Sequence, residues 1–478
     1  MTEPLRRRYI AGGNGIPARH VLLALILILA LCARLYEIDY NLDGDEIFSV
    51  NIAAEDFSGV VSGSLQDAVH PPLHNILLHF WVKAFGSSEI SVRSMSVLFS
   101  FLFLLTAYLL FMRLDLGRLA PGLLAVLAFS PFFVYYGQQA RPYALISFLS
   151  AANIYAFVRV LENPQHRGTV IPWVFSAALL LHSQYMGVVI IFMQLCIAFL
   201  YLQSGRLRIL GFGIAGISSI LPWLLAAVGH ALFAGTDPLP QISWLGPPSL
   251  MELAWFFVSV FGESPDLQAR WLMAAMAVPG LVYLKRFAAA RRLPAGHALI
   301  FSIGFGVPVL VYALSVLGPK PVFAARQLMG ASIAFVAAIG IFMSAMPRAM
   351  AALNAAVLFL FIGTSLPMGL PHDLKPPWRD MVKQMEEKHG ALEVVAQETW
   401  IQAPLKYYRT SGEVRLWRDP SGAAGEKFLY ACRPIGSRCS MIESGALKAR
   451  GALSMEWNWG YDKVYNKIRL YEIRGAGD

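Results

Sequence analysis

Three acidic residues, Asp43, Asp45 and Glu46, stand close together in the stretch YNLDGDEIFSVN. The stretch EIFSVNIAA predicts a helix. One carboxylate is enough to cap it, because the carboxylate can accept hydrogen bonds from the unpaired amide groups of the first turn. The other two are then left for different chemistry. A carboxylate can take a proton from a hydroxyl group or bind a metal ion. We therefore take Asp45 and Glu46 as candidate catalytic acids.

Positive charges stand in two short loops elsewhere in the chain. YYGQQARPYAL places Arg141 near Tyr143, and GPKPVFAARQLMG contains Lys320 and Arg326. A single Arg at a helix end often reaches lipid headgroups, which is the structural alternative. Three cations in almost uncharged loops favour a bound anion instead, and the guanidinium fork suits phosphate oxygens. With the acids, these residues predict a site that holds an anionic group and removes a proton from another molecule.

Further polar residues occur in QDAVHPPLH and LHSQYMG. Helix capping by the acid and packing of the histidines are the structural alternatives. His70 and His74 have a spacing that can bind a metal, but two prolines directly follow His70, so the sequence does not favour a divalent metal and predicts no certain cofactor. The residues assigned to substrate or donor binding are Asp43, Asp67, His70, Arg141, Tyr143, His182, Tyr185, Lys320 and Arg326.

The composition indicates that a membrane positions these residues. The chain has 478 residues, of which 56% are hydrophobic and 14% charged, whereas soluble domains average about 25% charged. About eleven apolar segments approach the length of roughly 20 residues that a spanning helix needs. They are 20–37, 92–112, 119–134, 142–158, 170–181, 186–202, 209–229, 269–284, 297–317, 328–346 and 349–368. We expect a polytopic helical bundle with a retained first helix. In such a protein the net charge of +9 does not indicate nucleic-acid binding.

The distribution of Lys and Arg predicts the orientation. Most of those that flank the apolar segments fall on the side of the basic N-terminus, which the positive-inside rule places in the cytoplasm. The acids, the candidate cations and the C-terminal region then lie outside. Two outer loops, 38–91 and 230–268, are long. Each contains a short apolar stretch, PPLHNILLHFWVKAFG and LMELAWFFVSVF, that suits a helix lying at the membrane surface.

The chain becomes more polar from His372 onward, so we expect a membrane domain over 1–371 and a small soluble α/β domain over 372–478. PWRDMVKQMEEKHG predicts a helix, and EVVAQ, KFLYAC and KIRLYEI predict strands. Cys432 and Cys439 would form a disulfide if this region lies in an oxidising compartment. Cys32 and Cys196 lie in apolar segments and are interpreted as packing residues.

Three motifs in this order resemble the GT-C class of membrane glycosyltransferases, in the bacterial branch related to protein O-mannosyltransferases and lipid A aminoarabinose transferases. They are DGDE, HPPLHNILLHFWVKAFGSSEISVRSMS and QQARPYAL. The resemblance implies an enzyme of the bacterial inner membrane. It would transfer a sugar from a polyprenyl-phosphate donor to a lipid, glycan or protein acceptor at the periplasmic face, with inversion, in contact with membrane lipids.

The resemblance also implies roles for individual residues. Asp45 matches the catalytic carboxylate, with Glu46 beside it, and Arg141 and Arg326 match positions expected at the donor phosphate. The sequence departs from the family pattern in two places. The acid that often stands two residues before the HPP histidine is replaced by Ala68, with Asp67 one position earlier. Gln327 follows Arg326 where the family often has tyrosine.

Three other classes of function are alternatives. A flippase or transporter would carry ionisable residues near the middle of its spans, where this chain has almost none. A polysaccharide polymerase or ligase would also have many spans and outer Arg residues, with its long loop late in the chain. A scaffold without enzymatic activity would leave the acids of the first loop unexplained.

Overall fold

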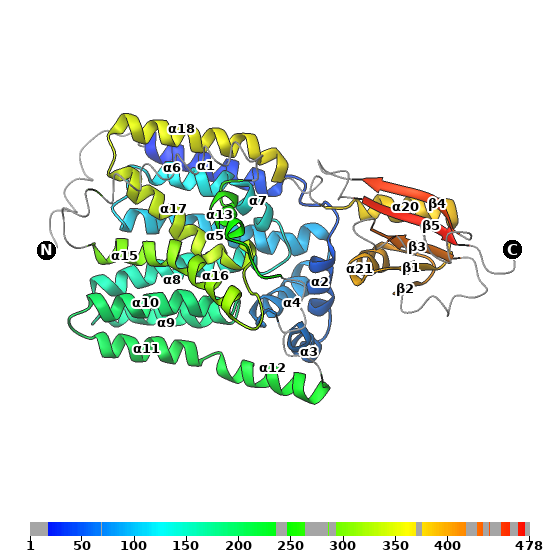
Figure 1. Cartoon of the computed structure of the whole chain (residues 1–478), viewed down its shortest axis with the longest axis horizontal. Coiled ribbons are helices and arrows are strands. Elements are labelled where there is room, and N and C mark those ends of the chain that lie inside the picture. The colour runs from blue at the N-terminus through cyan, green and yellow to red at the C-terminus, as the bar shows by residue number, and fades with distance from the viewer. Residues whose placement is uncertain are drawn as a thin grey trace.

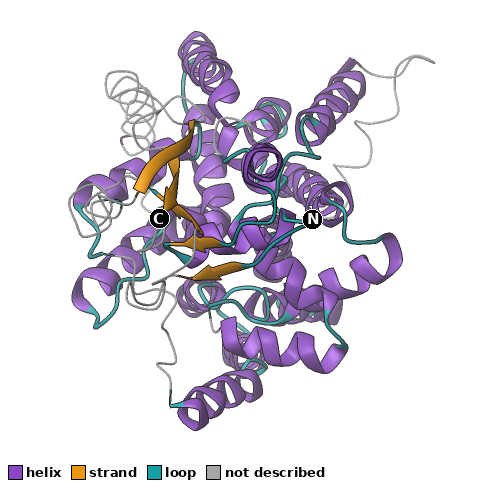
Figure 2. Ribbon diagram, turned by 90° about the vertical axis from the view of Figure 1, so that its right-hand side faces the viewer, coloured by secondary structure: helices purple, strands orange, loops and turns teal. Residues whose placement is uncertain are grey.

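The computed structural model in Figure 1 describes residues 18–67, 69–235, 246–262, 285, 293–369, 375–416, 428–433, 439, 451–458 and 467–473. Within these ranges the protein is a bundle of roughly parallel and antiparallel helices with a small sheet against one end. Figure 2 views the molecule from the sheet end, with the helices behind the strands. The prediction of a mainly helical protein with a small α/β C-terminal part is confirmed.

Seven of the described helical segments are long and apolar enough to cross a membrane. They are α1 (Ala18–Leu35), α5 (Glu89–Arg113), α8 (Tyr143–Glu162), α11 and α12 (Arg206–Ser218 and Leu221–Ala234), α15 to α16 (Ala295–Phe301 and Val307–Leu317), α17 (Met329–Ser344) with the short turn before it, and α18 (Arg348–Ser365). An eighth is the bent pair α6 (Ala120–Phe129) and α7 (Pro131–Gly137). The protein therefore spans the membrane several times.

Three shorter apolar helices accompany these spans: α9 (Arg167–Leu181), α10 (Gly187–Tyr201) and α13 (Leu250–Ser259). The first two coincide with predicted spans, and α13 coincides with the predicted surface helix of the second long loop. The predicted span 269–284 lies outside the described residues.

The bend between α6 and α7 is 59° and has a local cause. Pro131 has no amide hydrogen, so the chain cannot continue the helical hydrogen bonds of α6 past Ser130. The fully buried Arg34 of α1 fills the gap by donating to the carbonyl oxygens of Ala128 at 2.8 Å and Leu127 at 3.4 Å. The side-chain amide of Gln138, just after α7, donates in turn to the carbonyl oxygen of Arg34 at 3.1 Å. These contacts fix the turn that carries Arg141.

The first long loop folds into three short helices: α2 (Gly44–Ala54), α3 (Phe57–Asp67) and α4 (Leu73–Phe85). The predicted helix after the tandem proline is therefore confirmed. Its buried face includes His74 and His79, whereas Phe80 and Phe85 are exposed. An apolar outer face is what a helix at a membrane surface presents.

The C-terminal region contains a five-stranded sheet of order β2-β1-β3-β5-β4. The strands are β1 (Val394–Ala396), β2 (Val414–Leu416), β3 (Phe428–Cys432), β4 (Gly451–Asn458) and β5 (Lys467–Ile473). β1 pairs in parallel with β2 and β3, and the other pairs are antiparallel. The sheet packs with helices α20 (Trp378–His389) and α21 (Thr399–Tyr408). The predicted α20 and strands β1, β3 and β5 are confirmed, whereas β2, β4 and α21 were not predicted.

The predicted disulfide between Cys432 and Cys439 is also confirmed. Cys432 ends β3, and both cysteines are buried in a small cluster with Tyr430 and Tyr471. The bridge therefore holds Cys439 at the end of β3.

The C-terminal region docks on the first loop through specific hydrogen bonds. The hydroxyl of Tyr408, at the end of α21, accepts from the backbone amide of Leu42 at 2.7 Å. The backbone amide of Arg379 donates to the side chain of Asn41 at 3.0 Å, and its guanidinium pairs with Glu89 at 2.6 Å. α21 is thereby held against α2, next to the acidic cluster.

Candidate active site

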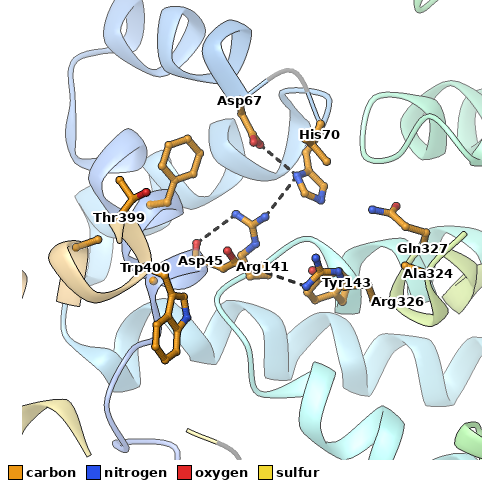
Figure 3. Close-up of a pocket in the computed structure, with 14 residues that line it drawn as sticks. Asp45, Asp67, His70, Arg141, Tyr143, Ala324, Arg326, Gln327, Thr399 and Trp400 are labelled. Carbon is orange, nitrogen blue, oxygen red and sulfur yellow. Dashed lines mark hydrogen bonds and ion pairs between the residues drawn. The ribbon is translucent and has the colours of Figure 1, made fainter. Parts of the chain in front are cut away.

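A pocket of about 560 Å³ opens where α2, the turn after α7, the turn before α17 and helix α21 meet. Its size lies in the range of about 300–1,000 Å³ that is usual for ligand sites. It is lined by Gly44, Asp45, Phe48, Asp67, Val69, His70, Arg141, Tyr143, Ala324, Arg326, Gln327, Thr399, Trp400 and Ala403. Figure 3 draws these residues as sticks and labels ten of them. The prediction that the first loop, the 135–141 turn and the 318–327 turn converge on one cavity is confirmed.

Asp43 is the residue that caps α2. Its carboxylate accepts from the backbone amide of Glu46 at 2.9 Å, and the Glu46 side chain accepts from the Asp43 amide at 3.1 Å. This reciprocal pair is a capping box, which satisfies two amide groups at once. Burial raises the pKa of the Asp43 carboxyl, and the ammonium of Lys375 at 3.4 Å opposes the rise. Asp43 therefore starts the helix and does not line the pocket.

Glu46 is fully buried and surrounded by donors. Its oxygens accept from Arg93 Nε and Nη2 at 2.9 and 2.8 Å, from Lys375 Nζ at 2.6 Å and from the Ala140 amide at 2.9 Å. Burial alone would raise the pKa of Glu46, but the two cations hold it well below its usual value. The carboxylate joins α2, α5, the turn before Arg141 and the segment that leads into α20. These donors occupy the hydrogen-bonding positions of both carboxylate oxygens, and Glu46 is not among the pocket residues.

Asp45 points the other way, into the pocket. Its side chain is 56% exposed, and one carboxylate oxygen lies 3.7 Å from Nη1 of Arg326. Adjacent residues of a helix point about 100° apart, so one acid can be buried while its neighbour faces solvent. Of the three acids, Asp45 is the one whose carboxylate reaches the cavity (Figure 3).

Arg141 lies in the pocket between Asp45 and His70. Its Nη1 donates to Ser49 Oγ at 2.7 Å and to the carbonyl oxygen of Asp45 at 3.2 Å, and its Nη2 lies 3.4 Å from His70 Nδ1. Burial alone would lower the pKa of the guanidinium, but Tyr143 and the nearby carboxylates raise it overall. A permanent cation with planar donors is therefore held beside the candidate acid.

Asp67 and His70, which both line the pocket, form a pair with Asp67 Oδ2 3.2 Å from His70 Nδ1. Burial alone would raise the pKa of Asp67, but the bond to His70 and the charge of Arg141 keep it below its usual value. Burial and Arg141 lower the pKa of His70. The same causes lower the pKa of the neighbouring His74 to about 3, so that this ring is neutral near pH 7.

Six of the predicted site residues line this pocket: Asp45, Asp67, His70, Arg141, Tyr143 and Arg326. Asp43, Glu46, His182, Tyr185 and Lys320 do not. The His182 carbonyl oxygen accepts from the Leu73 amide at 3.0 Å, which ties α9 to the start of α4. The Tyr185 hydroxyl accepts from Trp223 Nε1 at 3.1 Å. Both contacts support helix packing around the site. No group of three or more possible metal ligands occurs in the described ranges.

Sequence reasoning missed two kinds of residue. Arg93 and Lys375 hold Glu46. Arg93 could have been found as a cation within the apolar helix α5, whereas nothing in the sequence around Lys375 points to Glu46. Thr399, Trp400 and Ala403 line the pocket from α21, more than 350 positions after Asp45. No pattern in the sequence connects α21 with the acidic cluster, because the contact exists only in the folded protein.

The family model described as dolichyl-phosphate-mannose-protein mannosyltransferase matches residues 69–235. This match covers α4 to α12 and includes His70 and Arg141. The crystal structure of ArnT from Cupriavidus metallidurans bound to undecaprenyl phosphate is similar over 95% of this chain and 98% of that one, with a TM-score of 0.58 and 11% identity. The chain has a GT-C-like fold.

A second solved structure supports the same fold. The apo oligosaccharyltransferase of Archaeoglobus fulgidus is similar over 92% of this chain and 74% of that chain, with a TM-score of 0.50 and 12% identity. No protein with a curated function gives a significant match. The predicted resemblance to GT-C glycosyltransferases is therefore confirmed at the level of the family model and the fold.

Proposed function

We propose that this protein is a glycosyltransferase that moves a sugar from a polyprenyl-phosphate donor to a hydroxyl group of an acceptor. The observation that carries the proposal is the pairing of Asp45 with Arg326 in one pocket, with Arg141 beside them. A base and two cations at one cavity suit a reaction in which a hydroxyl loses a proton while a phosphate leaves. ArnT, which has a similar fold, was crystallised with undecaprenyl phosphate, and this supports a lipid phosphate as the donor.

In the proposed reaction Asp45 is the general base. The acceptor oxygen attacks the anomeric carbon of the donor sugar and gives its proton to the carboxylate. The bond between that carbon and the phosphate oxygen breaks from the opposite side, which inverts the anomeric centre. The polyprenyl phosphate leaves with the bonding electrons.

Arg326 and Arg141 are the proposed contacts for the leaving phosphate. Donors fixed in place before the reaction stabilise a developing negative charge without reorganising. Arg141 is held by Ser49 and the Asp45 backbone, so its position is set before any substrate arrives. Tyr143, Asp67 and His70 complete the proposed donor side. Glu46 is assigned a positioning role, since its contacts place Asp45 and Arg141 on neighbouring surfaces.

We further propose a bacterial inner membrane as the location, with the pocket on the periplasmic face. The proposal rests on the bias of Lys and Arg toward the N-terminal side of the bundle. A lipid-linked donor suits that face because it needs no cytoplasmic nucleotide sugar. Residues 1–371 are the proposed membrane domain and 372–478 the proposed soluble domain.

Binding of the donor lipid tests the function directly. Undecaprenyl phosphate should raise the melting temperature of the purified protein, and undecaprenol, which lacks the phosphate, should not. Cells that lack the protein should also lose one sugar modification of an envelope glycolipid, glycan or protein, as measured by mass spectrometry. Equal effects of the two lipids, together with unchanged envelope molecules, would exclude the proposed function.

A further inference from the structure

The pocket has two chemically different sides. Figure 3 shows Arg326 and Gln327 on one side, Thr399 and Trp400 on the other, and Asp45 between them. Of the two cations that line the pocket, Arg326 lies on the side away from α21 and Arg141 lies beside Asp45. None of the three pocket residues that α21 contributes is charged. The α21 side therefore suits a neutral group.

Aromatic rings dominate the neutral side. Trp400 is partly exposed and lines the pocket, and Phe48 stands one turn after Asp45 on α2 with 39% of its surface exposed. The indole and the Trp378 ring pack in a T-shaped arrangement with their centroids 5.5 Å apart, and the guanidinium of Arg433 lies over the indole, 5.4 Å from its ring centroid. A fixed aromatic ring in an open pocket can stack against a flat, weakly polar part of a ligand.

Gly44 lies directly against α21. A Cβ atom added at Gly44 would be in ordinary van der Waals contact with Trp400, 3.5 Å from its Cδ1 and 3.6 Å from its carbonyl oxygen. The aromatic side chain is thus placed directly next to the residue that precedes Asp45. A molecule that stacks on Trp400 has its hydroxyl groups close to the Asp45 carboxylate.

We infer that α21 forms the acceptor site and that the acceptor group is a carbohydrate ring. This inference rests on the proposed function and names its acceptor class. A pyranose ring has an apolar face of C–H groups for the indole and hydroxyl groups around its edge for Asp45 and Thr399. A peptide that binds by strand addition needs an exposed sheet edge. Among the described residues, the walls of this pocket are helices and turns.

Substitutions on α21 separate this role from folding. Trp400→Ala should lower formation of the sugar-modified product about tenfold, whereas Trp400→Tyr, which keeps an aromatic face, should retain most of it. Ala403→Trp should block the acceptor side by filling it. Trp457→Ala is the matched control, because this tryptophan lies on β4 and does not line the pocket.

The readout uses the full-length protein in two parallel measurements. Product is measured by mass spectrometry of envelope glycolipids, polysaccharides and proteins from cells that carry each variant. Undecaprenyl phosphate binding is measured on the purified variants by thermal shift, and it should be unchanged in all of them. Loss of binding in Trp400→Tyr and Ala403→Trp would contradict a separate acceptor side.

The two measurements also separate this inference from the proposed function. If wild-type protein binds undecaprenyl phosphate but modifies only a polypeptide, or if Trp400→Ala makes product at the wild-type rate, the carbohydrate acceptor site is wrong while the glycosyltransferase proposal stands. If wild-type protein neither binds the lipid selectively nor changes any envelope molecule, the function itself is wrong.

Discussion

Nη1 of Arg326 lies 3.7 Å from the carboxylate of Asp45, although the two residues are about 280 positions apart in the chain. A charge pair that is 31% and 56% exposed, at the edge of a cavity, contributes little to stability. Its position is better explained by a bound substrate that both groups contact. In the proposed reaction Arg326 is the phosphate contact and Asp45 is the base.

Replacing Arg326 by Lys tests the phosphate contact. Lysine keeps the charge but lacks the planar fork, so a bidentate contact is lost. We expect Arg326→Lys to weaken undecaprenyl phosphate binding roughly tenfold, and Arg141→Lys to weaken it in the same direction. Binding would be measured by titration of the lipid into purified protein. Arg118→Lys, remote from the pocket, is the control. Wild-type affinity in both pocket variants would show that Arg326 and Arg141 contact lipid headgroups and not the donor phosphate.

Replacing Glu46 by Gln should affect folding more than chemistry. The amide would leave the buried Arg93 without the Glu46 charge and Lys375 with only the Asp43 carboxylate at 3.4 Å, and breaking a buried pair costs roughly 3–5 kcal/mol. We expect a large drop in melting temperature, together with loss of the C-terminal docking. Because the pKa of Glu46 is lowered in the folded protein, its stabilisation is present above the usual glutamate range and is lost as the pH falls. A variant that melts like wild type would show that Glu46 is not a structural anchor.

The pH dependence of stability tests the burial of His74. Its pKa of about 3 in the folded protein is below the ordinary value of 6.5, so the folded state binds the proton more weakly than the unfolded state. The stabilisation is complete above about pH 6.5 and is lost as the pH falls toward 3, by up to about 1.4 kcal/mol per pH unit. His74→Gln should reduce the change of melting temperature with pH over this range. The exposed His166→Gln is the control; an unchanged slope in His74→Gln would refute the assignment.

Removing the disulfide tests its contribution to the C-terminal region. A bridge with a sequence separation of 7 closes a short loop, for which chain entropy predicts about 2–3 kcal/mol. Cys432→Ser together with Cys439→Ser should lower the melting temperature and leave donor binding intact. Free-thiol labelling of the wild-type protein should detect neither residue, and labelling of both in protein isolated from membranes would contradict the bridge.

The sequence was sufficient for the parts of this structure that depend on local patterns. Apolar length predicted the helices, and charge at the ends of neighbouring helices predicted that Asp45, Arg141 and Arg326 meet. Residue types and spacing alone did not separate Asp45 from Glu46, because the two are adjacent and the choice depends on Lys375, which lies 329 positions from Glu46. The resemblance to GT-C enzymes was what favoured Asp45. α21 was missed because Pro404 disfavours a helix there and its partner is a distant loop.

The proposed reaction depends on Asp45 accepting the proton of the acceptor hydroxyl. Asp45→Asn keeps the shape of the side chain and removes the base, and loss of a general base slows a reaction by about a hundred- to ten-thousand-fold. Asp39→Asn makes the same change on an exposed residue of the same loop and is the control. The decisive measurement is the rate of product formation by the two variants at equal protein level, with undecaprenyl phosphate binding measured alongside. We expect Asp45→Asn to bind the lipid normally, to melt near the wild-type temperature and to form product at least about a hundredfold more slowly. Transfer by Asp45→Asn at the wild-type rate would contradict this role of Asp45.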